Sequence, residues 1–232
     1  MADGVNHLVL LRHGQSIWNR EHRFTGWADV ELTPTGLRQA EQAGKLLHQH
    51  RLKFDRIYCS ELSRAGATLA CVLAQAPQHA APVVDWRLNE RHNGALEGMT
   101  PLTAIMRFGL WPVLACQLLN HYPPPPLATT DPAFPGNKPR YQQLAIDCLP
   151  QSESLLDVRQ RLAPFLEHPL RTDLQQHRNI LVVAHKNLLR ELMSLIVPQQ
   201  KPKRLATARP WLYQFDAHSN LLQADYLDTI AY

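Results

Sequence analysis

Short apolar runs that are each followed by a helical pattern constrain this 232-residue chain more than any other feature. Residues 5–11 form one such run, and residues 55–60 and 180–184 form two more. Runs of this length and composition are typical of strands that are buried on both faces of a sheet. Because strands that alternate with helices pair mostly in parallel, we expect a three-layer α/β/α fold around a mostly parallel central sheet.

The segments between these runs carry helix and hairpin signals. A Thr-Pro pair, which offers an N-cap and a first helical position, precedes apolar residues at helical spacing and predicts an amphipathic helix over 34–49. Similar spacing follows the second and third runs, beginning near Leu62 and near Asn187. Residues 211–216 and 221–226 predict a closing hairpin at the edge of the sheet.

Residues 93–150 depart from this alternation. They contain one predicted helix over 102–120, four consecutive prolines at 123–126, and a loop rich in Pro, Asn and Gly that runs to Asn137. We interpret 93–150 as a helical and loop insertion over the active site, within one domain that spans 1–232, since long ordered loops usually carry function. A flexible connector is the alternative interpretation.

Composition narrows the function classes. The net charge is +4, and the Lys and Arg residues form no continuous block along the sequence. We therefore expect no nucleic-acid partner. The N-terminus has no secretory pattern and no apolar run reaches the roughly 18 residues of a membrane helix, so we expect a cytoplasmic protein without a membrane partner. The cysteines form no CxxC pair and the histidines show no ligand spacing, so we expect no metal site.

Four side chains suited to phosphate chemistry follow the predicted strands. Arg12 and His13 come directly after the first strand, His185 follows another strand, and Arg64 lies at the start of the helix after the second strand. The carboxyl ends of parallel strands meet at one edge, where a helix N-terminus adds unpaired backbone N–H groups. Two guanidinium groups and a neutral ring nitrogen at that edge can bind a phosphate and attack its phosphorus.

Longer motifs surround these residues: LRHGQSIWN at 11–19, FTGWAD at 24–29 and WRLNERH at 86–92. They resemble the cofactor-dependent phosphoglycerate mutases of the histidine phosphatase superfamily. The RHG triplet marks only the superfamily, whereas the GW-D, NERH and four-proline segments are specific to the mutase branch. The similarity spans about residues 5–226 and includes further matches at 63–65, 122–126, 149–155 and 184–190.

The resemblance implies a phosphoglycerate mutase-like fold and a role for each matching residue. It implies that His13 is the nucleophile that forms a phosphohistidine and that Arg12, Arg64 and His185 bind the phosphoryl oxygens. Glu90 matches the general acid and base that protonates the leaving oxygen. The implied substrate-binding residues are Asn19, Thr25, Gly26, Arg91 and Asn187.

The sequence departs from the family where the mutases hold the rest of phosphoglycerate. Asn93 replaces a tyrosine, Pro101 a lysine, and Gln117 and Leu118 an arginine pair. Each lost charge-assisted hydrogen bond contributes roughly 1.5–3 kcal/mol, so we expect weak affinity for 3-phosphoglycerate. The insertion offers three candidate replacement cations, Arg107, Lys138 and Arg140.

Two further departures concern the surroundings of the phosphate. Lys186 stands where the family has a glycine, and its side chain either approaches the phosphate as an added substrate-binding group or points into solvent. The chain ends at Tyr232, soon after the predicted hairpin, whereas the mutases carry a longer tail over the site. We therefore expect water to reach the phosphohistidine and hydrolysis to compete with back-transfer.

Three functions stay open at this point. The first is a phosphatase or specialised phosphotransferase for a small phosphorylated metabolite other than 3-phosphoglycerate, which the departures favour. The second is a phosphoglycerate mutase with a rebuilt pocket, which would use a bisphosphorylated primer such as 2,3-bisphosphoglycerate. The third, a non-catalytic phosphometabolite-binding protein, is disfavoured because it would have no reason to keep His13 and Glu90. A homo-oligomer is compatible with the family in each case.

Overall fold

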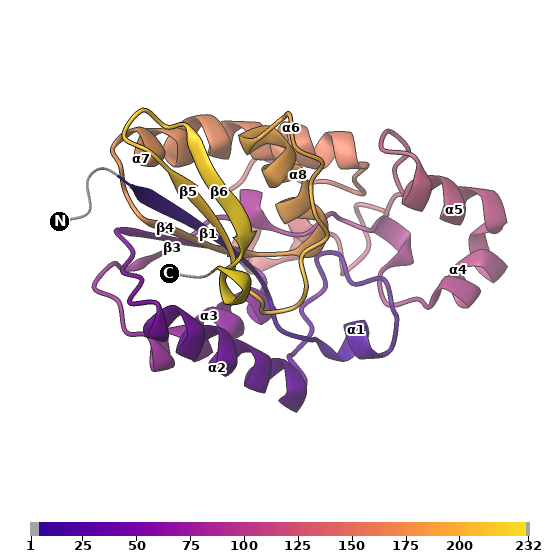
Figure 1. The fold of residues 1–232 in the computed structure, drawn as a ribbon. Coiled ribbons are helices and arrows are strands. Elements are labelled where there is room, and N and C mark those ends of the chain that lie inside the picture. The colour runs from indigo at the N-terminus through magenta and orange to yellow at the C-terminus, as the bar shows by residue number, and fades with distance from the viewer. Residues whose placement is uncertain (1–4, 231–232) are drawn as a thin grey trace.

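A six-stranded sheet with helices on both faces forms the centre of the molecule (Figure 1), as the computed structural model of residues 5–230 shows. The strand order is β3-β2-β4-β1-β5-β6, with parallel pairing from β3 to β1 and antiparallel pairing from β1 to β6. This confirms the predicted α/β fold and its mostly parallel sheet. The strands are β1 (Asn6–Arg12), β2 (Arg56–Cys59), β3 (Pro82–Val84), β4 (Ile180–Ala184), β5 (Trp211–Phe215) and β6 (Leu221–Tyr226).

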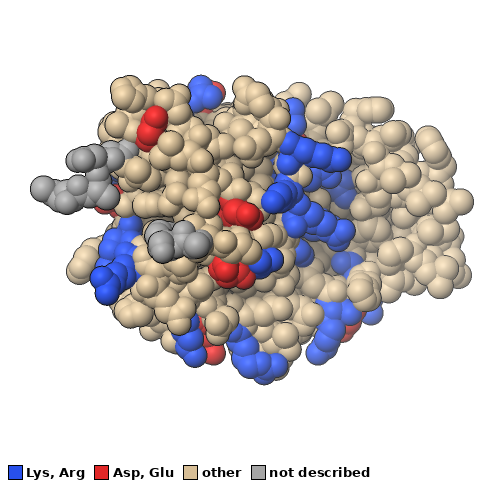
Figure 2. Space-filling view, in the orientation of Figure 1, with Lys and Arg blue, Asp and Glu red and all other residues tan. Residues whose placement is uncertain are grey.

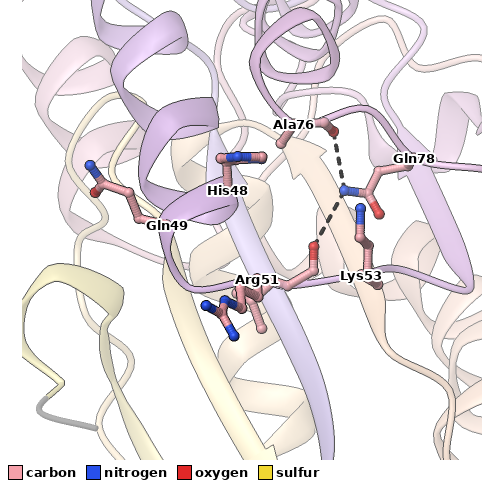
Figure 3. Close-up of a pocket in the computed structure, with 7 residues that line it drawn as sticks. His48, Gln49, Arg51, Lys53, Ala76 and Gln78 are labelled. Atoms are coloured by element: carbon pink, nitrogen blue, oxygen red, sulfur yellow. Dashed lines mark hydrogen bonds between the residues drawn. The ribbon is translucent and has the colours of Figure 1, made fainter.

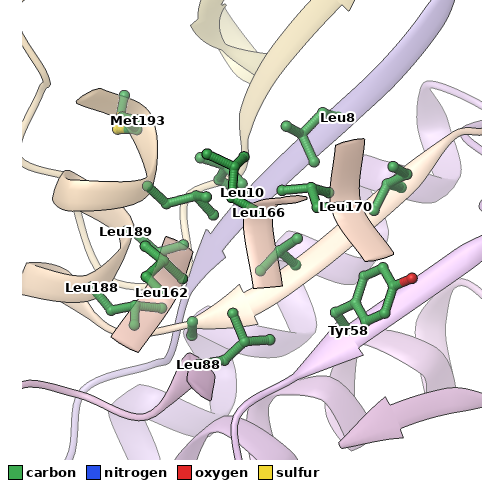
Figure 4. Packing of buried hydrophobic residues seen from close by; sticks show 14 of the residues in the cluster. Leu8, Leu10, Tyr58, Leu88, Leu162, Leu166, Leu170, Leu188, Leu189 and Met193 are labelled. Atoms are coloured by element: carbon green, nitrogen blue, oxygen red, sulfur yellow. The ribbon is translucent and has the colours of Figure 1, made fainter. Parts of the chain in front are cut away.

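Alternation along β1 builds the two sides of the core. Leu8 and Leu10 pack on one face against α6 (Leu155–Phe165) and α8 (Lys186–Ile196), and Figure 4 shows this cluster. Val9 and Leu11 pack on the other face against helices α2 (Pro34–Gln49) and α3 (Ser63–Gln75). Since successive side chains of a strand point to opposite faces, this one apolar run holds both helical layers onto the sheet.

Helix α2 begins where the sequence predicts. The hydroxyl oxygen of Thr33 accepts a hydrogen bond from the backbone N–H of Gly36 at 3.0 Å, and Pro34 occupies the first helical position. The predicted hairpin is confirmed as β5 and β6, and β5 pairs with β1 at the centre of the sheet. Helix α8 follows β4 directly, with His185 as its N-cap residue, so its N-terminus lies at the carboxyl edge of the sheet.

The insertion differs from the prediction of one helix over 102–120, which is wrong. It contains two helices, α4 (Pro101–Phe108) and α5 (Leu110–Leu118), which project from the body of the molecule (Figure 1). Gly109 separates them with φ 85° and ψ 161°, a conformation that is accessible essentially only to glycine and that no helix continues through. The apolar periodicity runs across this glycine, which is why the pattern looked continuous.

Several elements were not predicted. Helix α6 begins at a capping box formed by Ser154 and Asp157, a signal that the sequence does contain. Strand β3 is only three exposed residues long and carries no buried pattern. The remaining short elements are α1 (Ile17–Arg20), α7 (Arg171–Gln175), a π turn (Leu166–Leu170) and single 3₁₀ turns at Trp86–Leu88, Gly94–Leu96, Pro135–Asn137, Pro139–Tyr141, Ile146–Cys148 and Leu227–Thr229. Across residues 5–230, no helix combines the length and apolarity needed to cross a membrane.

The break in the insertion gives a stability prediction. Gly109→Ala should lower the free energy of unfolding by about 1–3 kcal/mol because of its positive φ, although the added Cβ would meet only Pro112 Cδ, at 3.9 Å. Gly66→Ala, in the interior of α3 with nothing within 4 Å of the added Cβ, is the control and should raise stability by about 0.5–1 kcal/mol. Urea unfolding followed by circular dichroism measures both. A neutral Gly109→Ala change would contradict the break between α4 and α5.

Candidate active site

A polar cavity of about 140 Å³ opens at the carboxyl edge of β1 and β4. The two strands stay paired up to this edge, where the backbone N–H of His13 donates to the carbonyl oxygen of Ala184 at 3.0 Å. Figure 2 shows Lys and Arg side chains gathered in the hollow between the body and the projecting insertion. The lining residues are Arg12, His13, Asn19, Arg23, Phe24, Thr25, Gly26, Arg64, Glu90, Arg91, Asn93, Gln117, Lys186 and Asn187.

His13 is buried and held in one tautomer. Its Nδ1 lies 2.7 Å from the carbonyl oxygen of Gly14, which can only accept, so Nδ1 carries the proton and Nε2 keeps its lone pair. Burial lowers the pKa of His13 well below its ordinary 6.5, and the charges of Arg64 and Arg12 lower it further. A neutral imidazole with a free Nε2 is a competent nucleophile near neutral pH.

His185 lies beside His13, with 5.0 Å between the ring centroids, and its tautomer follows from a chain of hydrogen bonds. The amide nitrogen of Asn89 donates to the Tyr141 hydroxyl at 2.9 Å, so its Oδ1 accepts from the Ser60 hydroxyl at 2.8 Å. Ser60 has no second proton to give, so His185 donates to it from Nε2 at 2.8 Å. Nδ1 of His185 is therefore the atom left for a ligand.

Both central arginines are anchored by backbone carbonyls. The two terminal nitrogens of Arg64 donate hydrogen bonds to the carbonyl oxygens of Ala28 and Gly26, each at 2.8 Å. Arg12 donates to the carbonyl oxygen of Leu205 at 3.2 Å. Burial lowers the pKa of Arg64 to about 10, so its guanidinium is still charged at neutral pH. Carbonyl anchors fix both groups without neutralising their charge.

Four buried polar atoms of residues at this site have no hydrogen-bond partner among the described residues: Nε of Arg12, Nε of Arg64, Nε of Arg91 and Nδ1 of His185. Leaving a buried polar group unpaired costs about 1–3 kcal/mol, and more when it is charged. A phosphate oxygen accepts from arginine Nε–H directly and pairs with His185 Nδ1 when one proton is shared between them. The arrangement therefore suits a tetrahedral oxyanion.

Glu90 places a carboxylate at the same cavity. Its Oε1 accepts from the backbone N–H of Arg91 at 2.8 Å, and its Oε2 accepts from the backbone N–H of Asn187, in the first turn of α8, at 3.4 Å. The carbonyl oxygen of Glu90 accepts from Trp27 Nε1 at 2.6 Å and from Arg161 at 3.2 Å. These bonds hold the Glu90 carboxylate in a fixed position beside a helix N-terminus.

The eleven residues to which sequence analysis assigned a catalytic or substrate-binding role lie at this site. Ten of them line the cavity, and His185 lies directly behind His13. Lys186 is one of these ten, and burial followed by the charge of Arg204 lowers its pKa, which favours the alternative in which its side chain approaches the phosphate. The roles of these side chains stay predictions.

The three candidate replacement cations from the insertion do not line the cavity. Its described lining does not include Arg107, Lys138 or Arg140. Arg140 pairs with Asp29 at 2.5 Å, and Arg107 lies over the ring of Phe108 at 5.3 Å. Sequence reasoning missed Arg23, a further cation that lines the cavity and directly precedes the 24–29 motif. It also missed Phe24, and it named Asn93 and Gln117 only as departures from the family.

A larger hollow of about 370 Å³ lies where α2 ends and the chain returns toward β2, at the opposite edge of the sheet (Figure 3). Its floor is organised by the Gln78 amide, which donates to the carbonyl oxygens of Ala76 and Leu52 at 3.1 and 3.3 Å. No carboxylate lines the described part of this hollow. The volume of a cavity therefore does not identify the candidate active site, whereas the side chains that line it do. Within residues 5–230, no cluster of three or more His, Cys, Asp or Glu side chains could hold a metal ion.

Comparison with known proteins agrees with this chemistry. Residues 8–217 match the model of the histidine phosphatase superfamily, branch 1. The chain is 42% identical over 214 residues to 2,3-bisphosphoglycerate-dependent phosphoglycerate mutase 1 of Nitrosomonas europaea. The aligned region covers 90% of this chain and 92% of that protein.

Solved structures share the fold at lower identity. The alpha-ribazole phosphatase from Shigella flexneri is 24% identical, with a TM-score of 0.70 over 97% of this chain and 98% of that one. A phosphoglycerate mutase from Bacillus anthracis is 20% identical, with a TM-score of 0.67 over 97% and 93%. Together with the family match, these findings confirm the resemblance drawn from the sequence motifs. The chain is a phosphoryl-transfer enzyme that belongs to the histidine phosphatase superfamily.

Proposed function

We propose that the protein is a phosphatase or specialised phosphotransferase that acts on a small phosphomonoester other than 3-phosphoglycerate, through a phosphohistidine at His13. One observation carries this proposal: a buried neutral imidazole presents a free Nε2 at a site with four buried polar atoms that have no partner among the described residues. That arrangement supports both attack on phosphorus and binding of the phosphoryl oxygens.

In the proposed reaction, His13 Nε2 forms a bond to phosphorus as the ester P–O bond breaks, and the leaving oxygen takes a proton from Glu90. Arg12 and Arg64 stabilise the negative charge that spreads over the equatorial oxygens, and His185 Nδ1 accepts the proton carried by one of these oxygens. Water then gives a proton back to Glu90 and attacks phosphorus, which releases phosphate and restores neutral His13. In a phosphotransferase, an acceptor hydroxyl takes the place of this water.

The rest of the cavity would select the substrate. Asn19, Thr25, Gly26 and Asn187 offer neutral hydrogen bonds, and Arg91 and Lys186 offer positive charge. We also propose that residues 1–232 act as one domain, with the insertion at 93–150 forming a wall of the site.

The wall argues against 3-phosphoglycerate. Arg91 donates to the Cys116 carbonyl oxygen at 2.7 Å and to the Asn93 side-chain oxygen at 3.2 Å. Asn93 and Gln117 thus stand at the cavity where the mutases have a phenol and an arginine, and Asn93 is already engaged by Arg91. Neutral amides cannot replace the charge-assisted bonds of a carboxylate.

A phosphoglycerate mutase is the second candidate. The 42% identity to a 2,3-bisphosphoglycerate-dependent mutase over 90% of the chain favours it, and Arg23 and Lys186 supply cations at the cavity. In that case 2,3-bisphosphoglycerate would serve as the primer that phosphorylates His13.

Phosphohistidine formation is the first expected outcome. Rapid quenching after mixing with a phosphomonoester should show an acid-labile phosphate on the intact protein by mass spectrometry. His13→Ala should abolish the label because it removes the attacking nitrogen, whereas His121→Ala, at an exposed histidine, should retain it. Equal labelling of both variants would contradict attack by His13.

Substrate preference is the second expected outcome. Turnover of at least one small phosphomonoester should exceed interconversion of 3- and 2-phosphoglycerate by at least about 100-fold, since two lost charge-assisted bonds at roughly 1.5–3 kcal/mol each amount to that factor or more. Steady-state assays with and without 2,3-bisphosphoglycerate measure both activities. Efficient interconversion that depends on the primer would establish the mutase instead.

A further inference from the structure

The projecting insertion carries an apolar surface that nothing covers among the described residues. We name it the hairpin surface, and its members are Leu102, Met106, Leu110, Trp111, Leu114 and Leu118. These side chains are between 39% and 78% exposed. A group of exposed large apolar side chains on one pair of helices marks an interaction site rather than ordinary surface.

Charge is almost absent from this part of the chain. Residues 98–130 contain no Asp or Glu, and Arg107 is their only Lys or Arg. Figure 2 shows this on the face that it displays. The end of the molecule formed by α4 and α5 is tan, whereas blue and red side chains are spread over the rest of that face. An apolar segment with one cation and no acid avoids repulsion from a negatively charged partner.

Cations adjoin the hairpin surface at the mouth of the cavity. Gln117 of α5 lines that cavity, and Leu114 and Leu110 precede it by three and seven residues, on the same face of the helix. Lys186 lines the mouth as well, and so does Arg23, whose guanidinium pairs with Glu21 at 2.7 Å. An apolar protrusion bordered by basic side chains is the pattern of proteins that lie on anionic membrane surfaces.

We propose that the protein docks onto an anionic lipid bilayer through the hairpin surface. The apolar side chains of α4 and α5 enter the boundary between headgroups and acyl chains, where Trp111 is well suited because indole favours that region. The basic groups at the mouth of the cavity then face the headgroup phosphates. This departs from the expectation of no membrane partner, which rested on the absence of a spanning segment, and docking requires none.

A second copy of the chain is the main competing occupant. A two-fold contact through the hairpin surface would bring two acid-free segments together, so that Arg107 of each copy would have no carboxylate of 98–130 to pair with. Anionic lipid supplies the missing negative charge.

Sedimentation with vesicles tests the proposal with the full-length protein. Vesicles of equal parts phosphatidylglycerol and phosphatidylcholine should retain the protein, and pure phosphatidylcholine vesicles should retain much less. The triple variant Leu102→Gln, Met106→Gln, Trp111→Gln should lower the partition coefficient by at least about tenfold, because three apolar side chains no longer enter the lipid.

The matched control carries three equally conservative changes at exposed apolar positions elsewhere, Val84→Gln, Ile146→Gln and Leu222→Gln. It should bind vesicles as the unmodified protein does, and both variants should hydrolyse a soluble phosphomonoester at the unmodified rate. Failure of the unmodified protein to bind anionic vesicles, or equal losses in both variants, would overturn the proposal. So would light scattering that shows a dimer which only the hairpin variant dissociates, since a second copy would then cover this surface. None of these outcomes depends on the identity of the substrate.

Discussion

The exclusion of a second proton from the His13 ring is the condition on which the site depends. A charged imidazole at this position would be buried and would lie close to Arg12 and Arg64, so the neutral ring is strongly favoured. The hydrogen bond from Nδ1 to the Gly14 carbonyl then decides which nitrogen is free. The same two arginines that suppress the charge of His13 are the groups that would bind the phosphate, so nucleophile and anion site are produced by one arrangement.

The fold creates this arrangement through strand register. Arg12 of β1 is paired with Ala184 of β4, so the residues that follow, His13 and His185, emerge side by side at the same edge. Backbone carbonyls from loops far apart in sequence then hold the guanidinium groups, and the Ser60–Asn89 hydrogen bond orients the second imidazole. Donors fixed in this way need little reorganisation when charge develops on a phosphoryl group. The unpartnered polar atoms represent a stability cost that a bound anion would remove.

Much of this could be predicted from the sequence because strand ends are easily recognised. The apolar runs at 5–11 and 180–184 place His13 and His185 at one edge once the sheet is parallel, and a capping signal placed helix α2 correctly. Prediction failed where the outcome depends on a single backbone conformation or on tertiary contacts. Gly109 divides a continuous apolar pattern into two helices, and Arg140 is drawn to Asp29 instead of to the cavity. The tautomer of His185 depends on partners from other segments, which no local pattern reveals.

The protonation state of His13 is the most direct test of the account. Nitrogen-15 NMR of histidine-labelled protein, with the His13 signals assigned by their loss in His13→Ala, reports which ring nitrogen carries a proton at each pH. Because burial and two cations lower the pKa, His13 should still be neutral at about pH 6, with its proton on Nδ1. A ring that titrates near its ordinary pKa of 6.5, or one that carries its proton on Nε2, would contradict the account.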